Sequence, residues 1–152
     1  MTARLANDAW ESLLTAHATL MRKFVDTDVW QGASIREYDV LYALSKCNGS
    51  TRISDLHEHV LLSQPALSRL VDRLVERGLV SRCEDPADAR ARRVSLTEAG
   101  RDLQRSIGRA HAADVASAMA PLTREELELL AALTSKLTAS QLAVANASRS
   151  AR

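Results

Sequence analysis

Residues that could do covalent or metal chemistry are few and lie far apart in this chain. His57 and His59, two of the four histidines, stand about 200° apart around a helix and cannot easily share one metal ion. Cys47 and Cys83 lack the CxxC spacing of a zinc or redox motif. The sequence has no Gly-rich phosphate loop and no nucleophile elbow. We therefore expect a protein that is not an enzyme and that uses no metal and no cofactor.

Arginine is a different case, because it gathers in one part of the chain. Seven of the arginines lie between Arg69 and Arg93. Guanidinium groups suit bidentate contacts with phosphates and other planar anions. The formal charge of the 152 residues is only +1, but a sum does not show how charge is distributed. The low net charge therefore does not exclude a polyanionic partner.

The composition is typical of one globular, mainly helical domain. Apolar residues make up 46% of the chain and charged residues 26%, whereas aromatic residues make up 3%. This balance, with many alanines and leucines, favours helices and argues against a sandwich or barrel. No run approaches the ~20 apolar residues that span a bilayer, and the first residues lack a signal-peptide pattern. We expect a cytoplasmic protein with no membrane partner.

Capping residues and apolar periodicity predict the order of the elements. The segments 34–37 and 123–126 each have the sequence of a capping box, which starts a helix. Two alternating segments, 79–83 and 93–96, predict a β-hairpin around a polar turn. Helix, short helix, helix and hairpin is the order of a winged helix-turn-helix. The helices are expected at about 8–31, 35–46, 54–60, 64–77, 97–118 and from the second capping box to 145.

The helix predicted over 64–77 has two contrasting faces. One face is an apolar stripe, within an arc of roughly 100°, made of Leu67, Leu70, Val71 and Leu74. The other face begins with small or polar residues, namely Ser63, Gln64, Pro65 and Ser68. We expect the stripe to be buried and the small polar face to approach another large structure closely.

Four short motifs follow one another in and after this helix. They are SRLVDRL at 68–74, GLV at 78–80, the pair Asp88-x-Arg90, and LTxxG at 96–100. In this order and spacing they resemble the multiple antibiotic resistance regulator (MarR) family of bacterial transcription factors. The helical flanks extend the resemblance over nearly the whole chain. His57 departs from the family's usual alanine, a change that should affect local packing alone.

The resemblance implies a mainly α fold with a small β-hairpin wing, in which long N- and C-terminal helices dimerise. We expect residues 1–152 to form a single MarR-type domain. Its dimerisation helices would be 8–31 and 97–145, and its DNA-binding lobe 35–96. The resemblance also implies a homodimeric repressor that binds double-stranded DNA at a palindromic operator. A small effector molecule, often aromatic in this family, would release it.

The recognition helix of a winged helix-turn-helix places its N-terminal residues at base edges in the major groove. By this geometry Gln64 can pair with adenine, and Arg69 with guanine or a phosphate. Pro65 can contact a thymine methyl group. The DNA-binding residues expected on this helix are Ser63, Gln64, Pro65, Ser68, Arg69 and Arg73. The alternative is that Ser63 is only an N-cap and that Arg69 is only solvated.

The hairpin is expected to supply the remaining DNA contacts. Arg90 at its tip would enter the minor groove, where A·T tracts concentrate negative potential. Asp88 would hold the Arg90 guanidinium by a charge-assisted hydrogen bond, and Arg92 and Arg93 would contact phosphates. A solvated, charged turn is the alternative.

On the recognition helix, two acidic residues are expected to pair with arginines three positions earlier: Asp72 with Arg69, and Glu76 with Arg73.

An effector site is expected between the dimerisation helices and the DNA-binding lobe. Aromatic walls with a polar group would suit a small aromatic anion. The candidate ligand-binding residues are Trp10, His17, Met21, Tyr38 and Tyr42. The alternative is that these side chains belong to the core.

Two other functions stay open at this point. One is an oxidant-sensing regulator that uses Cys47 or Cys83, although we expect both thiols to be buried structural residues. The other is a winged helix that serves as a protein-interaction or dimerisation module without DNA contact. The small polar recognition helix and the Asp88-x-Arg90 pair favour DNA binding over this second alternative.

Overall fold

The computed structural model describes residues 2–150, without the side chains of residues 89, 90 and 141–150. The chain divides into two compact units, one that ends at Ala113 and one that begins at Asp114. The first unit holds every strand and the helices up to most of α5, and the second holds α6.

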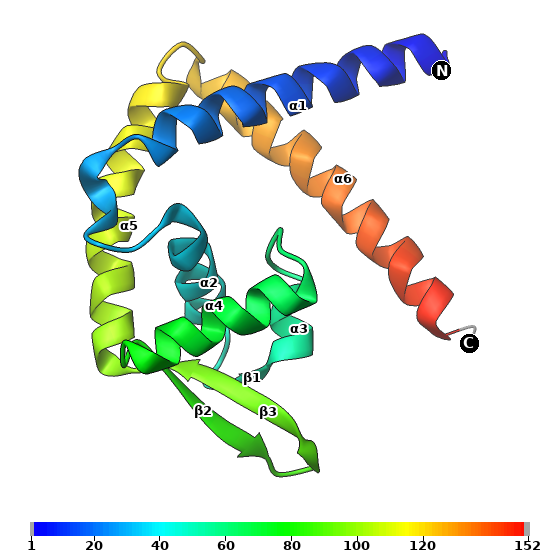
Figure 1. The fold of residues 1–152 in the computed structure, drawn as a ribbon. Helices are drawn as coiled ribbons and strands as arrows, with labels where there is room; N and C mark the ends of the chain where they lie inside the picture. Colours follow the sequence, from blue (N-terminus) through cyan, green and yellow to red (C-terminus); the bar gives the residue numbers. More distant parts are fainter. Residues whose placement is uncertain (1, 151–152) are drawn as a thin grey trace. The chain divides into compact units, whose positions relative to one another are not determined.

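The fold is mainly helical with a small antiparallel sheet, as the sequence predicted. Figure 1 shows the strands β2 and β3 as a hairpin that projects from the helices next to α4. The sheet has three strands in the order β1-β3-β2. The elements are α1 (Ala3–Val25), the 3-10 helix η1 (Asp28–Trp30), α2 (Ile35–Ser45), β1 (Thr51–Arg52), α3 (Ile53–His57), α4 (Gln64–Glu76), β2 (Val80–Asp85), β3 (Asp88–Leu96), α5 (Glu98–Met119) and α6 (Arg124–Ser150).

The core of the first unit lies where α2, α3, α4 and the sheet meet. The predicted stripe of α4 is buried in it, and none of its four side chains is more than 4% exposed. The stripe packs in one cluster with Leu41 of α2, Leu56 of α3 and Val94 of β3, which are fully buried. Burying such a side chain contributes roughly 1.5–3 kcal/mol to folding. This packing therefore sets which face of α4 points outward.

Local capping starts the helices where the sequence predicted. The Ser34 side chain accepts from the Glu37 N–H, and the Glu37 carboxylate accepts from the Ser34 N–H. The same reciprocal pair joins Thr123 and Glu126 before α6. Ser63 caps α4 by accepting from the Ala66 N–H, with a proline in the first turn. These caps occupy N–H groups that would otherwise lack a partner.

The first helix differs from the prediction of 8–31. It begins at Ala3 and ends at Val25. Apolar periodicity continues past its end, but other donors take the last carbonyls. Both the Thr27 hydroxyl and the Trp30 indole N–H donate to the Phe24 carbonyl. The chain then turns through Gln31 and Gly32, both at positive φ, before α2 begins.

The sheet is larger than the two short strands that alternation predicted. β1 has two residues, too few for a periodic signal. The hairpin continues to Asp85 and back from Asp88, and its turn is Pro86-Ala87. In its outer half, β3 alternates charged residues only with alanine, and β2 has the charged pair Glu84-Asp85, so no large apolar residues mark this part as strand.

Gly100 of the LTxxG motif lies where α5 meets the chain that leaves α4. A Cβ atom added at Gly100 would stand 2.0 Å from the carbonyl oxygen of Leu79. Leu79 is itself buried, so the backbone there has little room to move.

We expect Gly100→Ala to destabilise the protein by roughly 1–3 kcal/mol, the usual cost of overpacking a core. Urea unfolding measures the change. Ala99→Val, at the exposed neighbouring position, is the matched control and should cost much less. Equal stability of the Gly100→Ala variant and the unmodified protein would contradict this account of the motif.

Candidate nucleic-acid interface

The N-terminal half of α4 presents the small polar surface that its sequence predicted. Ser63, Gln64 and Pro65 are exposed, Ser68 is half-buried, and Arg69 and Arg73 are exposed. The cause is the burial of the opposite stripe, which turns these side chains away from the core. No ion pair or hydrogen bond of the Gln64 or Arg69 side chain is found within the described part of the chain, so both can take an external partner.

The C-terminal end of α4 is tied to the start of α2. Arg77 donates to the Glu37 carboxylate at 3.1 Å and to the Gly32 carbonyl at 3.3 Å. Glu37 is largely buried, with a side chain 11% exposed. Its other oxygen serves the α2 cap at Ser34. One carboxylate thus links α4 to the turn that leaves α1.

A second link joins α4 to the hairpin and corrects a prediction. Asp72 accepts from the Arg82 guanidinium on β2 at 2.7 Å. We had expected Asp72 to pair with Arg69, within the helix. The strand offers a guanidinium across the interface between α4 and β2, and this longer-range pair leaves Arg69 available to an external anion.

The hairpin carries the predicted wing residues. Arg92 donates to Glu84 on the neighbouring strand at 2.9 Å, and both side chains are exposed. Asp88 is exposed at the start of β3. The side chain of Arg90 lies outside the described residues, so its contact with Asp88 stays a prediction.

Asp85 is a buried carboxylate that sequence reasoning missed. Its side chain is 2% exposed. It accepts from Arg52 at 2.7 Å, from Arg93 at 3.3 Å and from the Ala87 N–H at 2.8 Å. The sequence shows an acidic residue before the turn, but it does not show that two arginines from β1 and β3 reach it.

These contacts hold the pKa of the Asp85 carboxyl well below its usual range. The hydrogen bond from Arg52 contributes most, followed by the Ala87 N–H, while burial acts in the opposite direction. A lowered pKa in the folded state means that the ionised carboxylate stabilises the fold. The contribution is complete above the unfolded pKa of ~3.9 and is lost as pH falls further.

The predicted ligand-binding residues do not gather in one place. His17 and Met21 line a cavity of ≈ 640 Å³ beside Asp39 and Leu61. Tyr42 lines a second cavity of ≈ 460 Å³, which Asp39 and Leu61 also border. Two adjoining hollows therefore lie along α1, α2 and the loop before α4.

The other two candidates lie elsewhere. Trp10 is exposed on α1 and borders neither hollow. Tyr38 is buried in an aromatic cluster, 5.7 Å from Trp30 and 5.9 Å from His111 between ring centroids. Burial raises the pKa of the Tyr38 hydroxyl. This cluster packs the end of α1 and the turn after it against α2 and α5.

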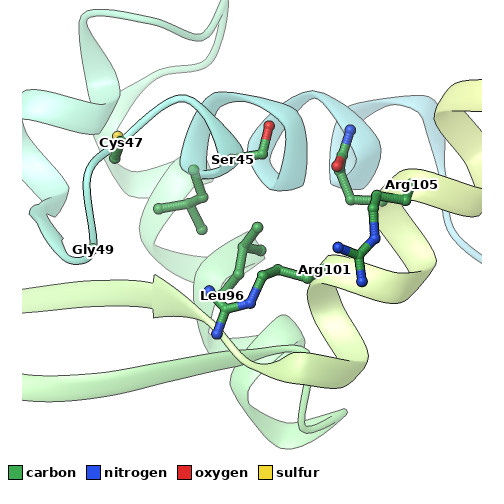
Figure 2. Close-up of a pocket in the computed structure, with 8 residues that line it drawn as sticks. Ser45, Cys47, Gly49, Leu96, Arg101 and Arg105 are labelled. Atoms are coloured by element: carbon green, nitrogen blue, oxygen red, sulfur yellow. The ribbon is translucent and has the colours of Figure 1, made fainter.

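A third hollow of ≈ 300 Å³ was not predicted. Figure 2 shows it between the end of α2, with Ser45 and Cys47, and the start of α5, with Arg101 and Arg105. Both arginines are exposed, and Arg105 already pairs with Asp102. None of the predicted effector residues lines it.

The two thiols differ in exposure. Cys47 is half-buried near the end of α2, but Cys83 is exposed on β2, so the expectation that both are buried was wrong. Cys83 lies in the middle of β2, where all four residues between Val80 and Asp85 are exposed.

Among the described residues, no group of three or more histidine, cysteine or acidic side chains could hold a metal ion. No helix in the described part is long and apolar enough to cross a membrane.

The lowered pKa of Asp85 leads to a pH prediction. We expect Asp85→Asn to unfold at a lower temperature than the unmodified protein at pH 7, because it replaces an ionised carboxylate that two guanidinium groups stabilise. The difference should shrink as pH falls below about 4, where the unmodified protein begins to lose this contribution. Thermal unfolding across pH measures both. If the difference in unfolding temperature between the two proteins is unchanged or larger at low pH, the ionised Asp85 carboxylate does not stabilise the fold in this way.

A MarR-family sequence profile matches residues 31–91 of this chain. The chain is also 27% identical over 134 residues to the HTH-type transcriptional repressor MdtR of Bacillus subtilis (strain 168), which covers 88% of this chain and 86% of the relative.

Solved structures share the fold. The PcaV transcriptional regulator from Streptomyces coelicolor, in complex with its natural ligand, is 26% identical with a TM-score of 0.67, covering 88% of this chain and 91% of that one. A mutant MarR from E. coli complexed with operator DNA is 23% identical with a TM-score of 0.73, covering 84% and 91%. In its motifs, its winged helix-turn-helix and these relatives, the chain is similar to the MarR family of transcriptional regulators.

Proposed function

We propose that this chain is a homodimeric repressor that binds a palindromic operator and is released by a small molecule. The observation that carries the proposal is the outward face of α4: a polar N-terminal surface with Gln64 and Arg69 exposed. The projecting hairpin stands beside it. Recognition helix and wing are the two parts that a winged helix-turn-helix presents to the major and minor grooves.

In this proposal Gln64 and Arg69 read base edges, while Ser63, Pro65 and Ser68 allow close approach. Arg73, Arg92 and the pair Asp88–Arg90 contact the backbone or the minor groove. The name of MdtR as a repressor and the operator complex of E. coli MarR support this assignment.

The dimer would form through the long terminal helices, which leave large apolar side chains in solvent. On α1 these include Leu5, Trp10 and Leu14, which are 61%, 58% and 50% exposed. On α6, Leu129 and Leu133 are 58% and 57% exposed. Large apolar side chains that stay exposed in number along a helix point to a protein contact. We propose residues 1–152 as a single domain, with these helices dimerising and the lobe at 35–96 binding DNA.

The effector would bind in the adjoining hollows lined by His17, Met21 and Tyr42. The ligand-bound PcaV structure supports a small-molecule partner for this fold. Asp39 stands between the two hollows, so an anionic effector must avoid its carboxylate or pair with a nearby cation, Arg36 or Lys46. Tyr38 would act through the aromatic cluster that packs the end of α1 against α2, whereas Trp10 lies outside both hollows.

We expect Arg69→Ala to weaken binding of the DNA duplex that this protein itself selects from a random library. Loss of a base-reading arginine costs roughly 1–3 kcal/mol, or ~5- to 150-fold in affinity. Fluorescence anisotropy at physiological salt measures it. Arg109→Ala, which removes the same charge from exposed α5, should change affinity much less.

The selected duplex should also contain two symmetric half-sites about 10 base pairs apart. Salt-insensitive binding, or no selected sequence, would contradict the proposal and favour a winged helix that contacts another protein. Unchanged affinity in Arg69→Ala would remove this residue from the interface.

We expect Leu133→Asp to convert the dimer to monomer, since it places a charge in the proposed apolar interface. Analytical ultracentrifugation measures the mass. Ser135→Asp, which adds the same charge about 200° around α6, should leave the dimer intact. An unmodified protein that sediments as a monomer would exclude the proposed assembly.

A further inference from the structure

The outer half of the hairpin lacks the support that its inner half receives. β1 pairs with β3 only through Thr51↔Val94 and Arg52↔Arg93. From Arg92 to the turn, β3 therefore pairs with β2 alone. A two-stranded ribbon is marginally stable by itself, so its ladder does not fix the direction in which the tip points.

The ladder is also irregular at the critical place. The register shifts between Glu84 and Asp85, just before the turn. The pairing passes from Glu84↔Arg92 to Asp85↔Asp88, and an irregularity of this kind interrupts the ladder and lets the strand bend. The direction of the tip, which carries Arg90, must therefore depend on side-chain contacts around this bend.

Those contacts converge on Asp85. Its carboxylate accepts from Arg52 on β1 and Arg93 on β3, and it also accepts from the Ala87 N–H in the turn. Arg93 continues the network, because it donates to the side chain and the carbonyl of Ser50 before β1. One buried side chain thus connects the turn of the wing to the strand that leads into α3.

We propose that Asp85 is a positioning residue that aims the wing tip at DNA, a role that rests on the proposed function. A buried carboxylate is costly to leave with one partner missing, so the network favours one orientation of the hairpin. Arg52 and Arg93 both donate to this carboxylate, so their role in the proposal is to hold the wing in place. Contact with DNA is left to residues nearer the tip.

Glu84 provides a matched control at the adjacent position. Its pair with Arg92 has a similar length, 2.9 Å, but the two side chains are 73% and 46% exposed. Exposed pairs of this kind contribute little. Glu84→Gln therefore removes one carboxylate charge from the same strand without disturbing the buried network.

The first experiment is amide hydrogen exchange of the unmodified protein, Asp85→Asn and Glu84→Gln. We expect Asp85→Asn to speed exchange in residues 82–94 and to leave α2 and α4 protected. Glu84→Gln should match the unmodified protein. Arg52→Gln removes the nearest hydrogen-bond donor to Asp85 but keeps the carboxylate. It should speed exchange in the same residues as Asp85→Asn, and it replaces that variant in the experiment if Asp85→Asn folds poorly.

The second experiment is a double-mutant cycle with Arg90→Ala on the selected duplex. Asp85→Asn alone should lower affinity on the order of tenfold, as losing one specific contact does. If Asp85 acts by placing Arg90, adding Asp85→Asn to Arg90→Ala should cost little more. Additive losses, or unchanged exchange in the wing, would overturn the inference.

The outcomes separate the two proposals. If the unmodified protein binds no duplex, the proposed function fails and this role fails with it. If the unmodified protein binds, Arg90→Ala weakens binding and Asp85→Asn does not, the positioning role alone is wrong.

Discussion

The burial of one face of α4 is the constraint on which the lobe formed by α2, α3, α4 and the sheet depends. The leucines of its stripe are enclosed by α2, α3 and β3, so the helix cannot rotate about its axis without exposing them. The polar N-terminal face is outward as a consequence. Recognition chemistry thus depends on apolar packing that contains no recognition residue, as expected when a rigid scaffold positions functional side chains.

Packing fixes the rotation of α4, whereas polar links orient the parts around it. Arg77 joins the end of α4 to Glu37 and the turn after α1, and Arg82 joins β2 to Asp72. The contacts of Arg77 span 40 and 45 residues of sequence, whereas the pair of Arg82 with Asp72 spans 10. The link at Glu37, like the network at Asp85, places a buried carboxylate against guanidinium groups. The strength of such a buried pair depends more on its geometry than the strength of an exposed pair does. The lobe is thereby held as one body from the turn after α1 to the wing.

The terminal helices follow a different rule. A capping box at Thr123 starts α6, whereas Thr2 before α1 makes no side-chain cap hydrogen bond. Several large apolar side chains of both helices stay exposed. A helix with an exposed apolar face does not bury it by local folding. The first unit therefore has its own core, while the apolar faces of α1 and α6 are available for association. This contrast separates a packed lobe with a polar outer face on α4 from helices that keep apolar side chains exposed.

The sequence by itself determined the mainly helical fold, the capped starts of α2, α4 and α6, and the two faces of α4. Each of these depends on residues within a few turns of one another, where periodicity and capping act. Tertiary structure decided the end of α1, the pairing of Asp72 with Arg82, and the exposure of Cys83. It also decided the Asp85 network, because Arg52 is 33 residues away from Asp85 in sequence. No local pattern encodes which distant charge will meet a buried carboxylate; that depends on how the strands come together.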